Sequence, residues 1–217
     1  MLVSDWDSKA PFDTLRSSLR SRESSDSGFR ASALQQQNDK FSINHTRYSV
    51  MLSLKIHDIK SFMNQLLLGD TFDNFETTEV SITTFNTFSI DGKIKKEFFD
   101  NIDTISSEET LPEYSSWEQL KPYCYQMIRG KRTPVSFKII FQLSQKEKEQ
   151  LLTSVHCTEE LTLSSGLFLN IQYKNRTLLC TTGIGFKAFF PDSRLKQIWD
   201  GAVLDFFHSR NILFEQL

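Results

Sequence analysis

Two hydrophobic periodicities alternate along this chain after Met51, and their order is the feature that most constrains its fold. Segments in which every second residue is apolar are typical of β-strands with one buried face, whereas apolar residues three and four positions apart are typical of amphipathic helices. The predicted strands cover residues 51–56, 80–90, 135–143, 167–173, 178–182, 186–190 and 212–214. The predicted helices cover residues 56–67, 121–128, 145–155 and 193–207.

This order excludes the regular strand-helix alternation of a doubly wound parallel sheet. We therefore expect an α+β fold, with a mostly antiparallel sheet and helices packed on one face of it. Each half of the domain opens with a strand, a helix and then strands, so the order also allows two strand-helix-strands halves. Asp91-Gly92 predicts a hairpin turn, because a type I′ turn requires positive φ at both central residues.

The helix that precedes the strand at 135–143 contains conflicting signals. Ser116 and Gln119 have the spacing of a capping box, which predicts a helix start at this point. Pro122 lies inside that helix, where it lacks a backbone donor and clashes with the preceding turn. A helix that begins near Lys121, with Pro122 in its first turn, would remove the conflict.

The first 50 residues differ in character from the rest. They contain 11 Ser and the run Gln35-Gln36-Gln37, with charges scattered among them and no apolar period. Such a segment buries too little apolar surface to offset the entropy of ordering its chain. We predict a disordered Ser-rich N-terminal extension over residues 1–50 and a single globular domain over 51–217, with Met51 as an alternative start.

Composition indicates a globular cytoplasmic protein. The chain has 19 Phe against 5 Tyr and 3 Trp, and rings without a polar group are best explained as core residues. No apolar stretch approaches the roughly 20 residues that cross a bilayer, which predicts no membrane contact. The three cysteines are an odd number without CxxC spacing, which favours reduced thiols in a cytosol.

Charge is unevenly distributed along the sequence. Residues 70–118 hold 12 acids against three lysines, a net charge of −9, whereas residues 119–138 hold five cations and no acid. Four of these cations are candidate ligands for a phosphate or a nucleic acid: Arg129, Lys131, Arg132 and Lys138. The alternative is that the cations neutralise a helix C-terminus and the acidic segment of the same chain.

Residues that could support catalysis or metal binding are few. The chain lacks the motifs GxxxxGK[ST], HExxH and GxSxG, and it has no GxGxxG after a strand. His57-Asp58 and His156-Cys157 are isolated pairs without further ligands at a zinc-like spacing. Cys124 lies near the basic stretch but within a predicted helix, where a buried thiol is expected. We predict no metal and no cofactor, and the catalytic residues of any enzyme activity stay unknown.

Two phenylalanines in the 80–90 segment are predicted to have different environments. Phe88 is in phase with Ile82 and Ile90, which predicts a core position. Phe85 falls on the other face and is predicted to be exposed or to face a partner.

Four segments after Met51 carry a resemblance to a known family. They are TFDNF at 71–75, SITTFNTFSIDG at 81–92, RGKRTPVSFKIIFQLS at 129–144 and GLFLNIQYKNRTLLCTTG at 166–183. On these segments, residues 51–217 resemble an uncharacterised bacterial family, a domain of unknown function. The resemblance implies a soluble intracellular domain and brings with it no reaction, substrate or catalytic residue.

Three functions stay open at this point. The first is a non-enzymatic intracellular binding or regulatory module with a protein partner, because the domain is well formed and no catalytic set converges. The second is nucleic-acid or phosphate binding through the basic 129–138 segment. The third, a weaker alternative, is an enzyme whose site is assembled from residues distant in sequence. The oligomeric state is left open.

Overall fold

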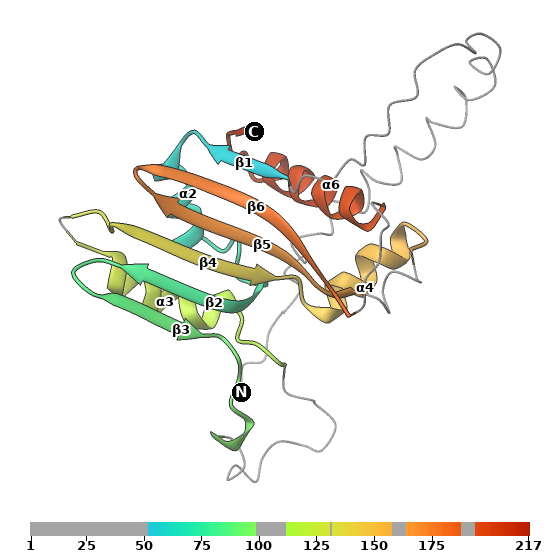
Figure 1. The fold of residues 1–217 in the computed structure, drawn as a ribbon, viewed down its shortest axis with the longest axis horizontal. Helices are drawn as coiled ribbons and strands as arrows, with labels where there is room; N and C mark the ends of the chain where they lie inside the picture. Colours follow the sequence, from blue (N-terminus) through green and yellow to red (C-terminus); the bar gives the residue numbers. More distant parts are fainter. Residues whose placement is uncertain (1–51, 99–111, 131, 158–163, 188–193) are drawn as a thin grey trace, which may run out of the picture.

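The computed structural model describes residues 52–98, 112–130, 132–157, 164–187 and 194–217, and it has the predicted α+β architecture (Figure 1). Seven strands form one sheet in the order β3-β2-β4-β5-β6-β1-β7. Every neighbouring pair in that order is antiparallel. The predicted N-terminal extension, residues 1–50, lies outside the described residues.

The elements follow the predicted order closely. The strands are β1 Ser53–Ile56, β2 Glu76–Thr83, β3 Thr87–Asp91, β4 Ser136–Gln142, β5 Ser164–Lys174, β6 Thr177–Phe186 and β7 Phe214–Gln216. The α-helices are α2 Ile59–Leu67, α3 Trp117–Ile128, α4 Gln145–Ser154 and α6 Arg194–Ser209, and a short 3-10 helix covers Lys96–Phe98.

The hydrophobic core lies between one face of the sheet and helices α2, α3 and α6. Phenyl rings from α2, from the segment after it, from β4 and from α6 contact one another with centroids 5.4 to 6.3 Å apart. Those rings belong to Phe62, Phe72, Phe75, Phe141, Phe206 and Phe207. The prediction that the phenylalanines fill the core is therefore confirmed for this cluster.

The opposite sheet face carries mostly polar side chains. The register places Lys55, Leu179, Gln172, Lys138 and Ser81 side by side across five strands of that face. All of these residues except Gln172 are half-buried. This is the alternation expected of strands that pack on a core through one face only.

The predicted strand 80–90 is in fact two strands, and this prediction was wrong. The chain reverses at residues 84–86, where the Thr84 N–H donates to the Asn86 carbonyl at 2.9 Å. Ile82 and Phe88 are paired across the hairpin. Paired residues point to the same face. Because six positions separate them, the two-residue period continues through the turn without a break.

The predicted hairpin at Asp91-Gly92 is also wrong, because Gly92 continues the line of β3. Its N–H donates to the Thr78 carbonyl at 3.1 Å, and no described glycine has positive φ. A Cβ at Gly92 would lie 1.7 Å from the Thr77 carbonyl oxygen. Glycine is required here for a close backbone approach and not for a turn conformation.

Helix α3 begins where the capping box predicts it, at Ser116, and not near Lys121. The Ser116 N–H donates to Gln119 Oε1 at 3.2 Å. Trp117 is completely buried and donates its indole N–H to the Leu66 carbonyl at 2.7 Å. These tertiary contacts keep the first turn helical although Pro122 lies inside the helix.

Two further expectations are revised at the end of the chain. Phe186 is the last residue of β6, and positions 188–190 of the predicted strand 186–190 lie outside the described residues. The two halves share their element order but not their pairing. β4 pairs with β5 of its own half, whereas β1 pairs with β6 of the other half.

Candidate functional site

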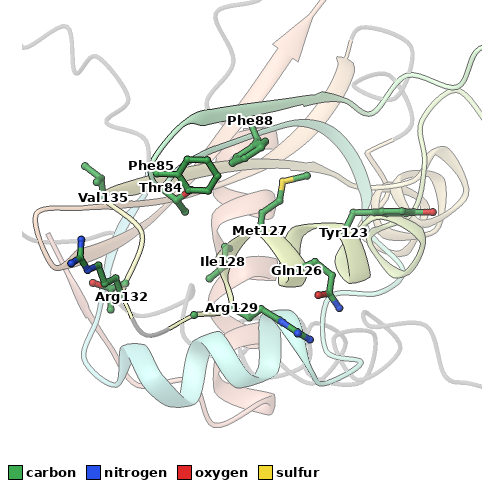
Figure 2. Close-up of a pocket in the computed structure, with 12 residues that line it drawn as sticks. Thr84, Phe85, Phe88, Tyr123, Gln126, Met127, Ile128, Arg129, Arg132 and Val135 are labelled. Carbon is green, nitrogen blue, oxygen red and sulfur yellow. The ribbon is translucent and has the colours of Figure 1, made fainter.

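A hollow of about 840 Å³ opens where three parts of the chain meet: the tip of the β2–β3 hairpin, the last turns of α3, and the loop that leads to β4 (Figure 2). It is lined by Thr84, Phe85, Phe88, Tyr123, Gln126, Met127, Ile128, Arg129, Gly130, Arg132, Thr133 and Val135. Figure 2 shows the Phe88 ring on the hairpin pointing toward Met127 on α3.

A smaller hollow of about 300 Å³ lies on the other side of the same loop. Its walls come from α2, from α3 and from the ends of β4 and β5. The two hollows share Ile128, Arg129, Gly130, Arg132 and Thr133. The loop that follows α3 is therefore a thin wall with a depression on each side.

Large apolar side chains at the first hollow are unusually exposed. The exposed fractions are 86% for Phe85, 64% for Tyr123 and 66% for Val135. Phe85 is exposed as predicted. The prediction of a core position for Phe88 was wrong. Phe88 is only half-buried, and its ring contacts the Phe85 ring with centroids 5.9 Å apart. Among the described strands, β3 lies at an edge of the sheet, so Phe88 has a strand neighbour on one side only.

Arg129 and Arg132 are the two predicted ligands that lie at this site. Arg129 is the C-cap residue of α3, and both arginines are exposed. In the part of the chain that the structure describes, neither guanidinium forms an ion pair with a carboxylate. Lys131, the cation between them, lies outside the described residues.

Lys138, the fourth predicted ligand, is not brought to the hollow. It lies on the polar sheet face and is 3.5 Å from the Glu79 carboxylate. Lys121, the remaining cation of the basic stretch, lies 2.5 and 2.8 Å from the two carboxylate oxygens of Asp73 and donates to the Gly69 carbonyl. Neutralisation of the acidic segment therefore describes these two lysines but not the two arginines.

Sequence reasoning missed Tyr123, Met127 and Val135 as members of the site. Met127, in the last turn of α3, is half-buried and packs against the core. The spacing of apolar residues in the sequence does not show that the tip of the β2–β3 hairpin leaves the last turn of α3 uncovered.

Two of the other candidate residues are accounted for by the fold itself. Asp58 is the N-cap of α2 and accepts from the Ser61 N–H at 2.9 Å. Cys124 is buried, and burial raises the pKa of its thiol to about 12, so it is held as the unreactive thiol. Within the described ranges, no group of three or more His, Cys, Asp or Glu side chains could hold a metal ion.

Comparison with known proteins identifies a family for the chain. The model of a family of unknown function, DUF5721, matches residues 65–215. The chain belongs to this family. No curated protein and no solved structure matches it. All the residues of both hollows except Ile59, Met63 and Asn64 lie inside the part matched by DUF5721. Among the described helices of this DUF5721 chain, none is long and apolar enough to span a membrane.

Proposed function

We propose that this DUF5721 protein is a non-catalytic binding module, and that it binds a protein partner at the hollow between the hairpin tip and α3. One observation carries the proposal: two arginines without a carboxylate partner in the described structure stand beside exposed aromatic rings. Aromatic residues, Met and Arg are the residue types enriched in protein interfaces and their hot spots.

The energetics of the exposed rings support a partner. A fully covered aromatic side chain removes about 150–250 Å² from water, which is worth roughly 4–6 kcal/mol at about 25 cal/mol per Å². Phe85 and Tyr123 keep most of that surface in solvent. A partner that covers both rings gains this energy, from which the cost of association is subtracted.

The cytoplasm of a bacterial cell is the proposed location. Cys124 and Cys180 are both buried, and neither forms a disulfide in the described structure. Buried cysteines that form no disulfide are better suited to a reducing compartment than to an oxidising one.

Nucleic acid is the less favoured partner. Binding to a phosphate backbone depends on many cations that each displace a counterion. The basic stretch contributes Arg129 and Arg132 to the site, whereas Lys121 and Lys138 are in ion pairs elsewhere.

The test is a selection of displayed random peptides for binding to the purified full chain. It compares this chain with the double variant Arg129→Glu/Arg132→Glu and with Tyr123→Ala. The matched control is Lys96→Glu/Lys146→Glu, which reverses two exposed cations away from the hollow. We expect peptides that bind the wild type and the control and lose affinity for both site variants.

A second measurement titrates a fluorescent single-stranded oligonucleotide at low salt. If the oligonucleotide binds and the arginine variant abolishes that binding, while no peptide is selected, then a protein partner is the wrong choice.

A further inference from the structure

We infer that the occupant of this site is an extended peptide segment with acidic residues at one end, and that it binds by adding to β3 as a further strand of the sheet. This inference rests on the proposed function and specifies the chemistry of the partner. Strand addition to an exposed sheet edge is an established mode of peptide recognition.

Among the described residues, the hydrogen-bonding phase of the hairpin leaves half of the β3 backbone groups without a partner. Gly92 bonds to Thr78, and Thr84 bonds to Asn86, so the hydrogen-bonded positions alternate from these two points. Ile90 and Phe88 then turn their N–H and C=O groups to β2. Thr87, Ser89 and Asp91 turn theirs to the open edge, where they form a template for another strand.

The first hollow lies beside this edge. Phe88 reaches it from β3, and Tyr123 and Met127 reach it from α3 (Figure 2). In an added strand, every second side chain would point to the same face as Phe88. Those side chains would enter the space between β3 and α3. An apolar side chain of the peptide at this place would cover the exposed rings of the first hollow.

The other edge of the sheet lacks these features. β7 has three residues, whereas β3 has five. Phe214 of β7 packs against Phe207 with centroids 5.9 Å apart, and Glu215 forms an ion pair with Lys55 at 3.5 Å. A short strand with charged side chains is a common protection against edge pairing, so β3 is the edge that remains suited to a partner.

Charge gives the added strand a polarity. The Val135 N–H donates to the Thr83 carbonyl at 2.8 Å, which ties the arginine-bearing loop to the hairpin tip. The far end of β3 carries Asp91, paired with Lys95 at 2.7 Å. Acidic residues of the segment are therefore expected beside Arg129 and Arg132, at the hairpin-tip end.

The decisive experiment uses Ser89→Pro in the full chain. Proline removes the outward N–H of residue 89, which bonds to no described residue, and edge strands tolerate proline. Ser89→Ala is the matched control, because it removes the same hydroxyl and keeps the N–H. Thermal unfolding of both variants checks that the fold is retained.

The probes are the peptides selected on the wild type, measured by fluorescence polarisation. We expect Ser89→Pro to weaken their binding about tenfold or more, since it deletes a backbone hydrogen bond and distorts its neighbours. Ser89→Ala should change it less than about twofold. Peptides in which acidic residues are replaced by Lys should lose affinity for the wild type, and should lose less for Arg129→Glu/Arg132→Glu.

The outcomes separate the two proposals. If the arginine variant loses binding and Ser89→Pro keeps it, the site binds a peptide but strand addition is wrong. If no variant changes binding, or no peptide is selected, the proposed function fails as well. A dimer in light scattering that Ser89→Pro dissociates would overturn the inference in favour of a second copy of this chain on β3.

Discussion

The two ends of helix α3 are built from the same stretch of sequence but have opposite environments. At the first end, Trp117 is completely buried, and Lys121 is held by the Asp73 carboxylate and the Gly69 carbonyl. Toward the last end, Tyr123 in the middle of the helix is 64% exposed, and Arg129, the C-cap residue, has no carboxylate partner among the described residues. One end of the helix has its polar groups matched inside the molecule, and the other presents unmatched groups to solvent.

This difference shows that residue type does not decide a role in this domain. An aromatic residue and a cation occur at each end, yet only the first pair has neighbours that cover and neutralise it. We infer that the first end of α3 maintains stability and the last end maintains binding. Substitutions along the helix should separate these two properties.

Trp117→Ala should have the largest effect on stability. It removes a fully buried ring and the hydrogen bond from its Nε1 to the Leu66 carbonyl. We expect the free energy of unfolding to fall by about 3–5 kcal/mol in urea denaturation. Tyr123→Ala, at the exposed end, should change it by about 0.5 kcal/mol or less. Equal losses in the two variants would remove the distinction between the ends.

Lys121→Met should have the next largest effect. The variant leaves the Asp73 carboxylate and the Gly69 carbonyl without the ammonium donor in a mostly buried place. A loss of about 2 kcal/mol in the free energy of unfolding is expected, below the value for a completely buried pair. The comparison is Lys138→Met, which breaks the exposed pair with Glu79 and should cost about 0.5 kcal/mol or less. If Lys121→Met left the free energy of unfolding unchanged, this ion pair would not stabilise the fold.

Glu76, which forms a β-bridge with the α3 cap residue Ser116, should make stability depend on pH. Burial raises its pKa from 4.5 to about 7, and the carboxylates of Glu113 and Glu147 act in the same direction. Between these pH values the folded state binds a proton that the unfolded state has released. The free energy of unfolding therefore falls as pH rises from 4.5 to about 7 and stays lower above it.

Glu76→Gln should remove this dependence. Since Glu76 is only half-buried, we expect the variant to be more stable than the wild type by about 1 kcal/mol at alkaline pH. The two proteins should be equally stable in acid, where Glu76 is protonated in both states. Parallel stability curves across the whole pH range would contradict the raised pKa.

Arg129→Glu/Arg132→Glu should have the smallest effect on stability. Both side chains are exposed and without a carboxylate partner in the described structure, so the free energy of unfolding should change by about 0.5 kcal/mol or less. The same variant is expected to lose peptide binding. Measured together, urea denaturation and fluorescence polarisation would sharpen the contrast between the ends of α3. A large loss of stability would instead give the arginines a structural role.

Most of the fold could be predicted because its signals are local. Alternation fixed which face of 135–143 turns inward. The spacing of Ser116 and Gln119 marked the start of α3, but the predicted start near Lys121 was wrong because it gave Pro122 more weight than this spacing. The hairpin in 80–90 was missed because the alternation of apolar and polar residues continues through its turn, so the sequence pattern is the same as that of one long strand. The candidate site was half predicted: Arg129 and Arg132 lie there, while Lys138 faces the other side of the sheet.

By itself, the sequence determined the periodicities, the caps and the concentration of cations in 119–138, because each depends on residues close together in the chain. Only the tertiary structure decided which of those cations have partners. Lys121 meets Asp73 from 48 positions away and Lys138 meets Glu79 from 59, while the arginines meet no described carboxylate. The attraction between charges in water is weak beyond a few ångströms. The pairing of distant elements therefore determines which charges stay free for a partner.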